Sequence, residues 1–63
     1  MTNRVAEVRK AKSLSQQELA DRAGISRTYL SIIETTPDKV LSNDVMFRIA
    51  RVLDVGIEHI FLP

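Results

Sequence analysis

The strongest constraint on the fold is a pair of short helical segments separated by a glycine turn. Ser15 is followed three positions later by Glu18, so the hydroxyl and the carboxylate can satisfy each other's unpaired backbone amides in a capping box. Gly24 is placed to adopt the left-handed conformation that ends a helix. Only Ile25 then separates it from Ser26, a favourable N-cap for the next segment. The sequence therefore predicts two helices that meet across a tight turn.

The spacing of apolar residues fits a helix-turn-helix over residues 15–34, a motif of two short helices joined by a turn that often contains glycine. The small side chain of Ala20 lets the second helix approach the first, and Gly24 permits the turn. Leu30 and Ile33 lie one helical turn apart and can hold the two helices together as one unit.

Three further helices are predicted from capping residues and apolar periodicity. They are a segment of about Thr2 to Lys12, a long helix capped by Ser42 or Asn43, and a short last helix after Gly56 that contains Ile57, Ile60 and Phe61 and ends before Pro63. Pro37 and Asp38 mark Thr35 to Leu41 as a loop, and no segment has the pattern of a strand. The prediction is an all-α, five-helix bundle that forms a single domain over residues 1–63.

Composition excludes several classes of function. Nine Lys and Arg against eight Asp and Glu give a net charge of +1, so charge alone does not indicate nucleic-acid binding. With no cysteine and one histidine, His59, we expect no disulfide, no metal site and no cofactor. The absence of a glycine-rich phosphate loop or a nucleophile with a nearby base argues against an enzyme. No long apolar run predicts a signal peptide or a membrane span, which favours a cytoplasmic protein.

The segment LSQQELADRAGISRTYLSIIE resembles the Cro and lambdoid phage repressor family of helix-turn-helix proteins, also called Xre-like. The segment FRIARVLDVGIEHIF is similar to the fourth and fifth helices of that family, so the resemblance extends from about Arg4 to Phe61. It implies a bundle of the lambda-repressor type and a transcriptional regulator, more specifically a repressor, that binds double-stranded DNA.

The third helix, about residues 26–35, is the expected major-groove element. With Leu30 and Ile33 buried, ~100° per residue leaves Arg27, Thr28, Ser31, Ile32 and Thr35 on or beside the outward face. A recognition helix presents its N-terminal residues to base edges, and the resemblance implies the same positions and adds Gln16 to the base-contacting set. Arg27 can bond a guanine at two acceptors, or bind a phosphate instead, and Thr28 can touch a thymine methyl group.

Ile32 is unusual because an isoleucine on the outward face of a polar helix needs a reason, and similar proteins often carry a polar residue there. Three interpretations stay open: apolar contact with thymine methyl groups, partial burial against the following loop, or an exposed apolar side chain without a role.

Phosphate contacts are expected mainly at helix N-termini, where unpaired amides and the helix dipole favour an anion. The candidates are Ser15, Gln17, Tyr29, Thr35, Lys39, Ser42 and Asn43. The residues after Glu34 depart from the family pattern, which usually has glycine or asparagine there and an apolar residue at the position of Asn43.

Arg9 and Glu34 match a pair that joins the first and third helices of similar repressors through a salt bridge. We favour this structural bridge over the alternative of an exposed ion pair worth ~0–1 kcal/mol.

Self-association is predicted because one small domain contacts few base pairs, and a homodimer on a palindrome would place half-sites ~34–36 Å apart. The expected interface is the C-terminal apolar group Ile57, Ile60, Phe61 and Leu62. The alternative function is a protein-interaction module, such as an antitoxin, whose fold serves a regulatory protein partner. Salt dependence separates the two, because DNA binding weakens steeply as counterions are released.

Overall fold

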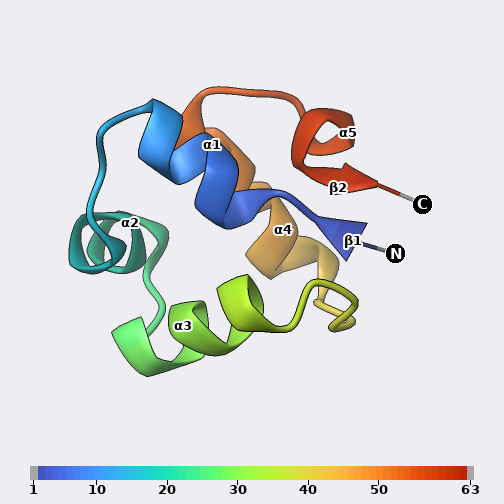
Figure 1. Ribbon diagram of the computed structural model, residues 1–63, viewed down its shortest axis with the longest axis horizontal. Helices are drawn as coiled ribbons and strands as arrows, with labels where there is room; N and C mark the ends of the chain where they lie inside the picture. Colours follow the sequence, from blue (N-terminus) through green and yellow to red (C-terminus); the bar gives the residue numbers. More distant parts are fainter. Residues whose placement is uncertain (1, 63) are drawn as a thin grey trace.

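The computed structural model describes residues 2–62, in which helices enclose a small core and the two chain ends lie side by side (Figure 1). In chain order the elements are β1 (Thr2–Asn3), α1 (Val5–Ala11), α2 (Gln16–Ala23), α3 (Arg27–Thr35), α4 (Asn43–Leu53), α5 (Ile57–Ile60) and β2 (Phe61–Leu62). The five-helix bundle is confirmed. The longest helix within residues 2–62 has 11 residues, which is too short to cross a bilayer.

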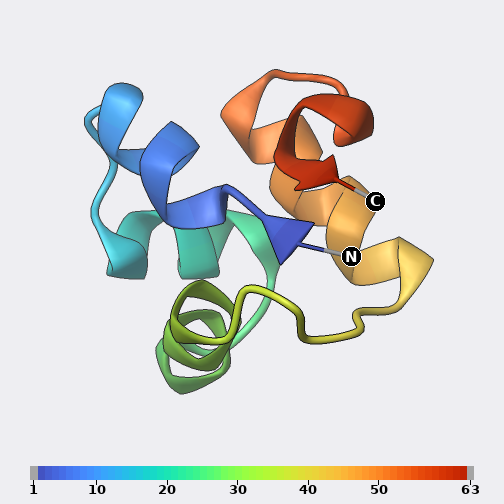
Figure 2. The ribbon, with the colours of Figure 1, turned by 45° about the vertical axis from the view of Figure 1, so that its right-hand side comes forward.

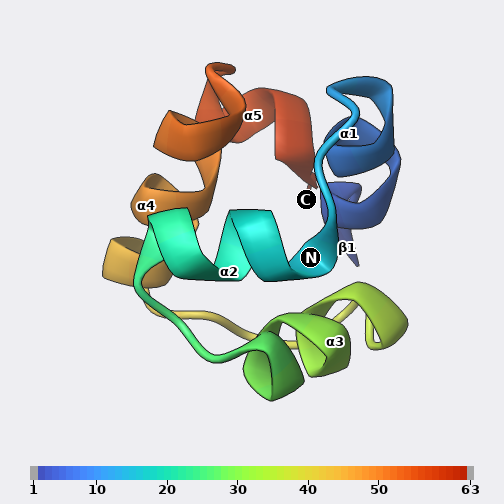
Figure 3. The same cartoon turned by 90° about the vertical axis from the view of Figure 1, so that its left-hand side faces the viewer.

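Helix α2 is central to the packing, because α3 and α4 both pack against it. Helix α1 contacts α3 and α4, and α5 packs on α4. Figure 2 shows α3 at the edge of the bundle, on the opposite side from α5. Figure 3 shows it beneath α2. One long face of α3 therefore remains at the protein surface.

The helix-turn-helix forms through the local signals that predicted it. The Ser15 hydroxyl accepts the Glu18 amide at 3.0 Å, and the Glu18 carboxylate accepts the Ser15 amide at 2.9 Å, which completes the capping box. Gly24 ends α2 with a φ of 70°. The Ser26 hydroxyl then accepts the Tyr29 amide at 3.0 Å and begins α3. Residues 15–34 therefore form the predicted motif.

Replacing Gly24 with alanine is expected to destabilise the protein by about 1 kcal/mol. The left-handed conformation costs an L-residue about 1–2 kcal/mol, partly offset because alanine also restricts the unfolded chain. An added Cβ would lie 3.5 Å from Arg48 Nη1, an ordinary contact, so the cost comes from the backbone alone. Urea unfolding followed by circular dichroism measures the change. The control G24N should lose less, since asparagine tolerates this conformation; equal losses in G24A and G24N would contradict the explanation.

The core draws residues from α1 to α5, from β2 and from the chain before α4. Its buried apolar members are Val5, Val8, Leu19, Ala20, Ala23, Leu30, Ile33, Leu41, Ile49, Ala50, Leu53, Ile60 and Phe61. Ala20, Leu30 and Ile33 are fully buried, as their spacing predicts. The longest helix, α4, is capped by Ser42, whose hydroxyl accepts the Val45 amide at 3.2 Å.

The sequence predicts that the first helix starts near Thr2 and that the chain has no strand, and both predictions are wrong. Helix α1 begins at Val5, while Thr2 and Asn3 pair antiparallel with Leu62 and Phe61. The pairing continues where the Arg4 amide donates to the carbonyl of Ile60 at 2.8 Å. Helical periodicity is a local signal, and it carries no information about partners at the opposite end of the chain.

The last helix is shorter than predicted, and this corrects the expected dimer interface. Helix α5 ends at Ile60, and Phe61 begins β2. Ile60 and Phe61 are 0% and 6% exposed, because the chain's own core uses them, so neither side chain is free for a second protein. Ile57 and Leu62 stay partly exposed. The predicted helix stop at Pro63 lies outside the described residues.

Candidate nucleic-acid interface

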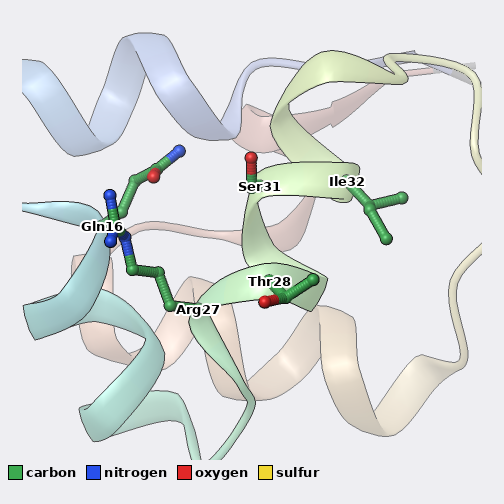
Figure 4. Close-up of a pocket in the computed structure, with 5 residues that line it drawn as sticks. All are labelled: Gln16, Arg27, Thr28, Ser31 and Ile32. Atoms are coloured by element: carbon green, nitrogen blue, oxygen red, sulfur yellow. The ribbon is translucent and has the colours of Figure 1, made fainter.

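The five residues predicted to contact bases lie around one shallow hollow of about 280 Å³. Gln16 comes from the start of α2, and Arg27, Thr28, Ser31 and Ile32 come from α3. Figure 4 shows Gln16 and Arg27 where the two helices meet, with Ser31, Thr28 and Ile32 placed further along α3. The packing of α2 on α3 thus assembles polar and apolar groups from both helices at a single surface.

The α3 side of this hollow is open to solvent. Arg27 and Thr28 are exposed in the first turn, and Ile32 is 44% exposed one turn later. This exposure argues against burial in the following loop as the reason for an isoleucine there. Within residues 2–62, Arg27 forms no salt bridge and donates no side-chain hydrogen bond to protein. Its guanidinium is therefore free to bind an acceptor outside the protein.

Behind the hollow, a buried ion pair joins α1 to α3. Arg9 Nε lies 2.6 Å from Glu34 Oε2, and the two side chains are 11% and 5% exposed. Arg9 Nη2 donates to Glu34 Oε1 at 3.1 Å, and Arg9 Nη1 donates to the carbonyl of Leu14 at 2.8 Å. The predicted bridge between the first and third helices is formed, and its burial excludes the exposed alternative.

Glu34 also holds Gln16. The Gln16 amide nitrogen donates to Glu34 Oε1 at 2.9 Å, so one carboxylate connects α1, α2 and α3. An amide group has two N–H donors and one carbonyl acceptor. With one N–H bound to Glu34, the other N–H and the carbonyl of Gln16 remain available at the hollow.

The N-termini of α2 and α4 carry the predicted phosphate contacts Ser15, Ser42 and Asn43, which are all exposed. The two serine hydroxyl oxygens already accept backbone amides, which leaves each O–H free to donate to an anion. The backbone hydrogen bond from Ser15 holds the pKa of Glu18 below its usual value, and the bond from the Ser15 side chain acts in the same direction.

The other candidates for phosphate contact differ in whether their polar groups already form hydrogen bonds within the protein and in how far they are buried. Thr35 donates its hydroxyl to the Ser31 carbonyl at 2.8 Å, and the Gln17 amide donates to Asp21 at 2.7 Å. Tyr29 packs partly against the core, and Lys39 is half-buried in the loop after α3. Thr35 would have to give up its internal bond to donate to a phosphate, whereas Gln17 keeps a second N–H that can donate.

Sequence reasoning overlooked Asn3, which ties the N-terminus to the loop after α3. Its amide donates to the carbonyls of Ile33 at 3.2 Å and Pro37 at 3.3 Å, and its oxygen accepts the Val5 amide at 3.1 Å. No local signal could have revealed contacts between residues 30 and 34 positions apart. Asn3 fixes the point at which the chain leaves α3.

Comparison with known proteins places this geometry among related domains. Residues 5–60 match the family model described as Helix-turn-helix. A curated relative is the HTH-type transcriptional regulator SinR of Bacillus subtilis, 37% identical over 54 residues. The match covers 86% of this chain and 49% of SinR, so the chain spans about half the length of the curated relatives it matches.

Solved structures of related proteins have the same fold. A crystal structure of SinR, the master regulator for biofilm formation, in complex with DNA superposes with a TM-score of 0.80 at 35% identity, covering 86% of each chain. The restriction-modification controller protein C.AhdI from Aeromonas hydrophila gives a TM-score of 0.77 at 31% identity, covering 86% of this chain and 80% of its own. The structural similarity covers most of the chain, and the family match over residues 5–60 includes the residues that line the hollow.

Proposed function

The chain belongs to the helix-turn-helix family of the Xre and Cro type, and on that basis we propose that it is a sequence-specific DNA-binding transcriptional regulator that acts as a repressor. Its ligand is double-stranded DNA, with α3 in the major groove. The observation that carries the proposal is the hollow formed by Gln16, Arg27, Thr28, Ser31 and Ile32.

The chemistry of the hollow suits base edges in a major groove. Arg27 offers a planar fork for guanine O6 and N7, and the Gln16 amide can donate and accept. Ile32 and the methyl group of Thr28 offer apolar contact to a thymine methyl group. Phosphates bind at the N-termini of α2 and α4, where backbone amides and the serine hydroxyl groups donate to them. The predicted phosphate contacts Ser15, Ser42 and Asn43 lie at these two helix ends.

The proposal includes a homodimer on a palindromic site. One α3 helix reads only a few base pairs, and a two-fold dimer doubles the contacts on half-sites ~34–36 Å apart. The regulator performs no catalysis and uses no cofactor. Residues 1–63 act as a single DNA-binding domain, and they act in the cytoplasm, where the cell's DNA lies. Relatives described as transcriptional regulators support this role.

Selection from a randomised pool of double-stranded DNA tests the function. We expect enrichment of a palindrome, with affinity for it falling linearly in a log–log plot against salt as counterions are released. Unrelated DNA of the same length serves as the control for sequence-independent binding.

Failure to enrich any sequence, at low or at moderate salt, would reject the regulator. Tight binding of a protein from the same cell, insensitive to salt, would then favour the alternative of an antitoxin or other interaction module.

A further inference from the structure

The outward face of α3 carries one exposed isoleucine among polar neighbours. Ile32 is 44% exposed, and the other residues that line its hollow are Gln16, Arg27, Thr28 and Ser31. Thr28 lies one turn before Ile32, and residues four apart on a helix are neighbours. Figure 4 shows the methyl carbon of Thr28 on the side facing Ile32 and its oxygen on the side facing Arg27. The hollow therefore has an apolar part, formed by Ile32 and the Thr28 methyl group, beside its polar part.

This apolar part lacks the groups that tell thymine from cytosine. In the major groove, thymine presents the O4 acceptor and a methyl group at C5, whereas cytosine presents an amino group that donates. The Ile32 side chain neither donates nor accepts a hydrogen bond, so it can contact only the methyl group. The Thr28 hydroxyl can donate or accept, so it suits O4 and the amino group alike. The pair can therefore hold a C5-methyl group without distinguishing the base that carries it.

We propose that Thr28 and Ile32 recognise the C5-methyl group of a pyrimidine in itself, so that 5-methylcytosine can replace thymine at this point of the operator. 5-Methylcytosine carries its methyl group on the same ring carbon as thymine, and the group projects into the major groove from the same place. Methylation of a cytosine at this position therefore strengthens binding, and the protein responds to cytosine methylation of its DNA. The inference rests on the proposed function, in which α3 occupies the major groove.

The size of the effect follows from the burial of one methyl group. Unmethylated cytosine has only a hydrogen at C5, so Ile32 would lose its contact there. Burying one such group is worth about fourfold in affinity, or about 15-fold when two copies bind the two halves of a palindrome. One helical turn rises about 5.4 Å and successive bases of a strand lie about 3.4 Å apart, so the preference covers one or two adjacent base pairs.

A methyl group of DNA fits this surface better than an apolar partner protein. Two neighbouring side chains make an apolar area far smaller than the patches that mark protein interfaces. The same hollow contains Arg27, whose guanidinium has no bond within residues 2–62, and an apolar partner would bury that charge without an acceptor. A base pair offers acceptors to Arg27 and a methyl group to Ile32 together.

Four pyrimidines at one position separate the methyl group from the base. In the selected operator, the pyrimidine of each base pair is made in turn thymine, uracil, cytosine or 5-methylcytosine, opposite its matching purine and identically in both half-sites. Fluorescence anisotropy measures the affinity of each duplex. At one position, or at two adjacent ones, we expect thymine to bind about 15-fold more tightly than uracil, and 5-methylcytosine to exceed cytosine by the same factor.

Variants of α3 assign the preference to these two side chains. Ile32→Ala should bring both ratios close to one, and Thr28→Ser, which keeps the hydroxyl and removes the methyl group, should lower both by less. Because Ile32 is partly exposed, thermal unfolding of Ile32→Ala should stay close to that of the unchanged chain. Val40→Ala is the matched control, since Val40 is 83% exposed and does not line the hollow, and it should leave both ratios unchanged.

Three results would overturn the inference while the proposed function stands. Equal affinity for thymine and uracil at every position would show that no methyl group is recognised. A preference for thymine without one for 5-methylcytosine would show that the base is read instead. Ratios that persist in Ile32→Ala would assign the methyl effect to the DNA itself. Selection that enriches no operator would overturn the proposed function and this inference together.

Discussion

Replacing Arg9 with methionine is expected to destabilise the protein by about 3–5 kcal/mol, the cost of leaving one member of a buried ion pair without its partner. Glu34, whose side chain is 5% exposed in the unchanged chain, would lose two hydrogen bonds from Arg9. A domain of this size is stable by only about 3–9 kcal/mol, so the substitution should remove a third or more of its stability and lower its Tm clearly. Thermal and urea unfolding followed by circular dichroism at 222 nm measure the loss.

The double variant R9M/E34L is the matched control. Replacing both members of a buried pair with apolar residues of similar size is often neutral, because no charge is left in the core. The double variant should therefore be more stable than R9M alone. If R9M were within about 1 kcal/mol of the unchanged chain, the pair would be behaving as an exposed one despite its burial.

The helix-turn-helix could be predicted because each of its determinants is local. Ser15 and Glu18 cap α2 within a single turn, Gly24 ends it, and Ser26 begins α3, so neighbours in the sequence decide the outcome. The outward face of α3 follows from the same regularity, since burying Leu30 requires Thr28 and Ile32 to lie on other sides of the helix.

What the sequence did not reveal depends on contacts between distant parts of the chain. The pairing of Asn3 with Phe61 requires the two ends of the chain to meet, and no periodic pattern reports that. For the same reason Ile60 and Phe61 were expected at a dimer interface, although the core needs them.

Replacing Arg27 distinguishes a specific contact with a base from electrostatic attraction to a phosphate. If its guanidinium bonds guanine at two acceptors, Arg27→Ala should cost ~1–3 kcal/mol per half-site, a loss of about 5- to 150-fold, and relax the preference at one base pair. Arg27 is exposed and forms no side-chain hydrogen bond within residues 2–62, so R27A should unfold within about 0.5 kcal/mol of the unchanged chain. Fluorescence anisotropy with the selected operator and with single-base variants measures both quantities.

The conservative variant R27K decides between the two roles. Lysine keeps the positive charge but lacks the rigid fork that matches guanine, so a base contact is lost in R27K nearly as fully as in R27A. A phosphate contact would survive in R27K, and R27A would then weaken binding to all sequences alike while lowering the salt slope by about one unit. Since Arg27 opens the first turn of α3, where a recognition helix meets base edges, we expect R27K to resemble R27A on the operator and to retain most of the affinity for unrelated DNA.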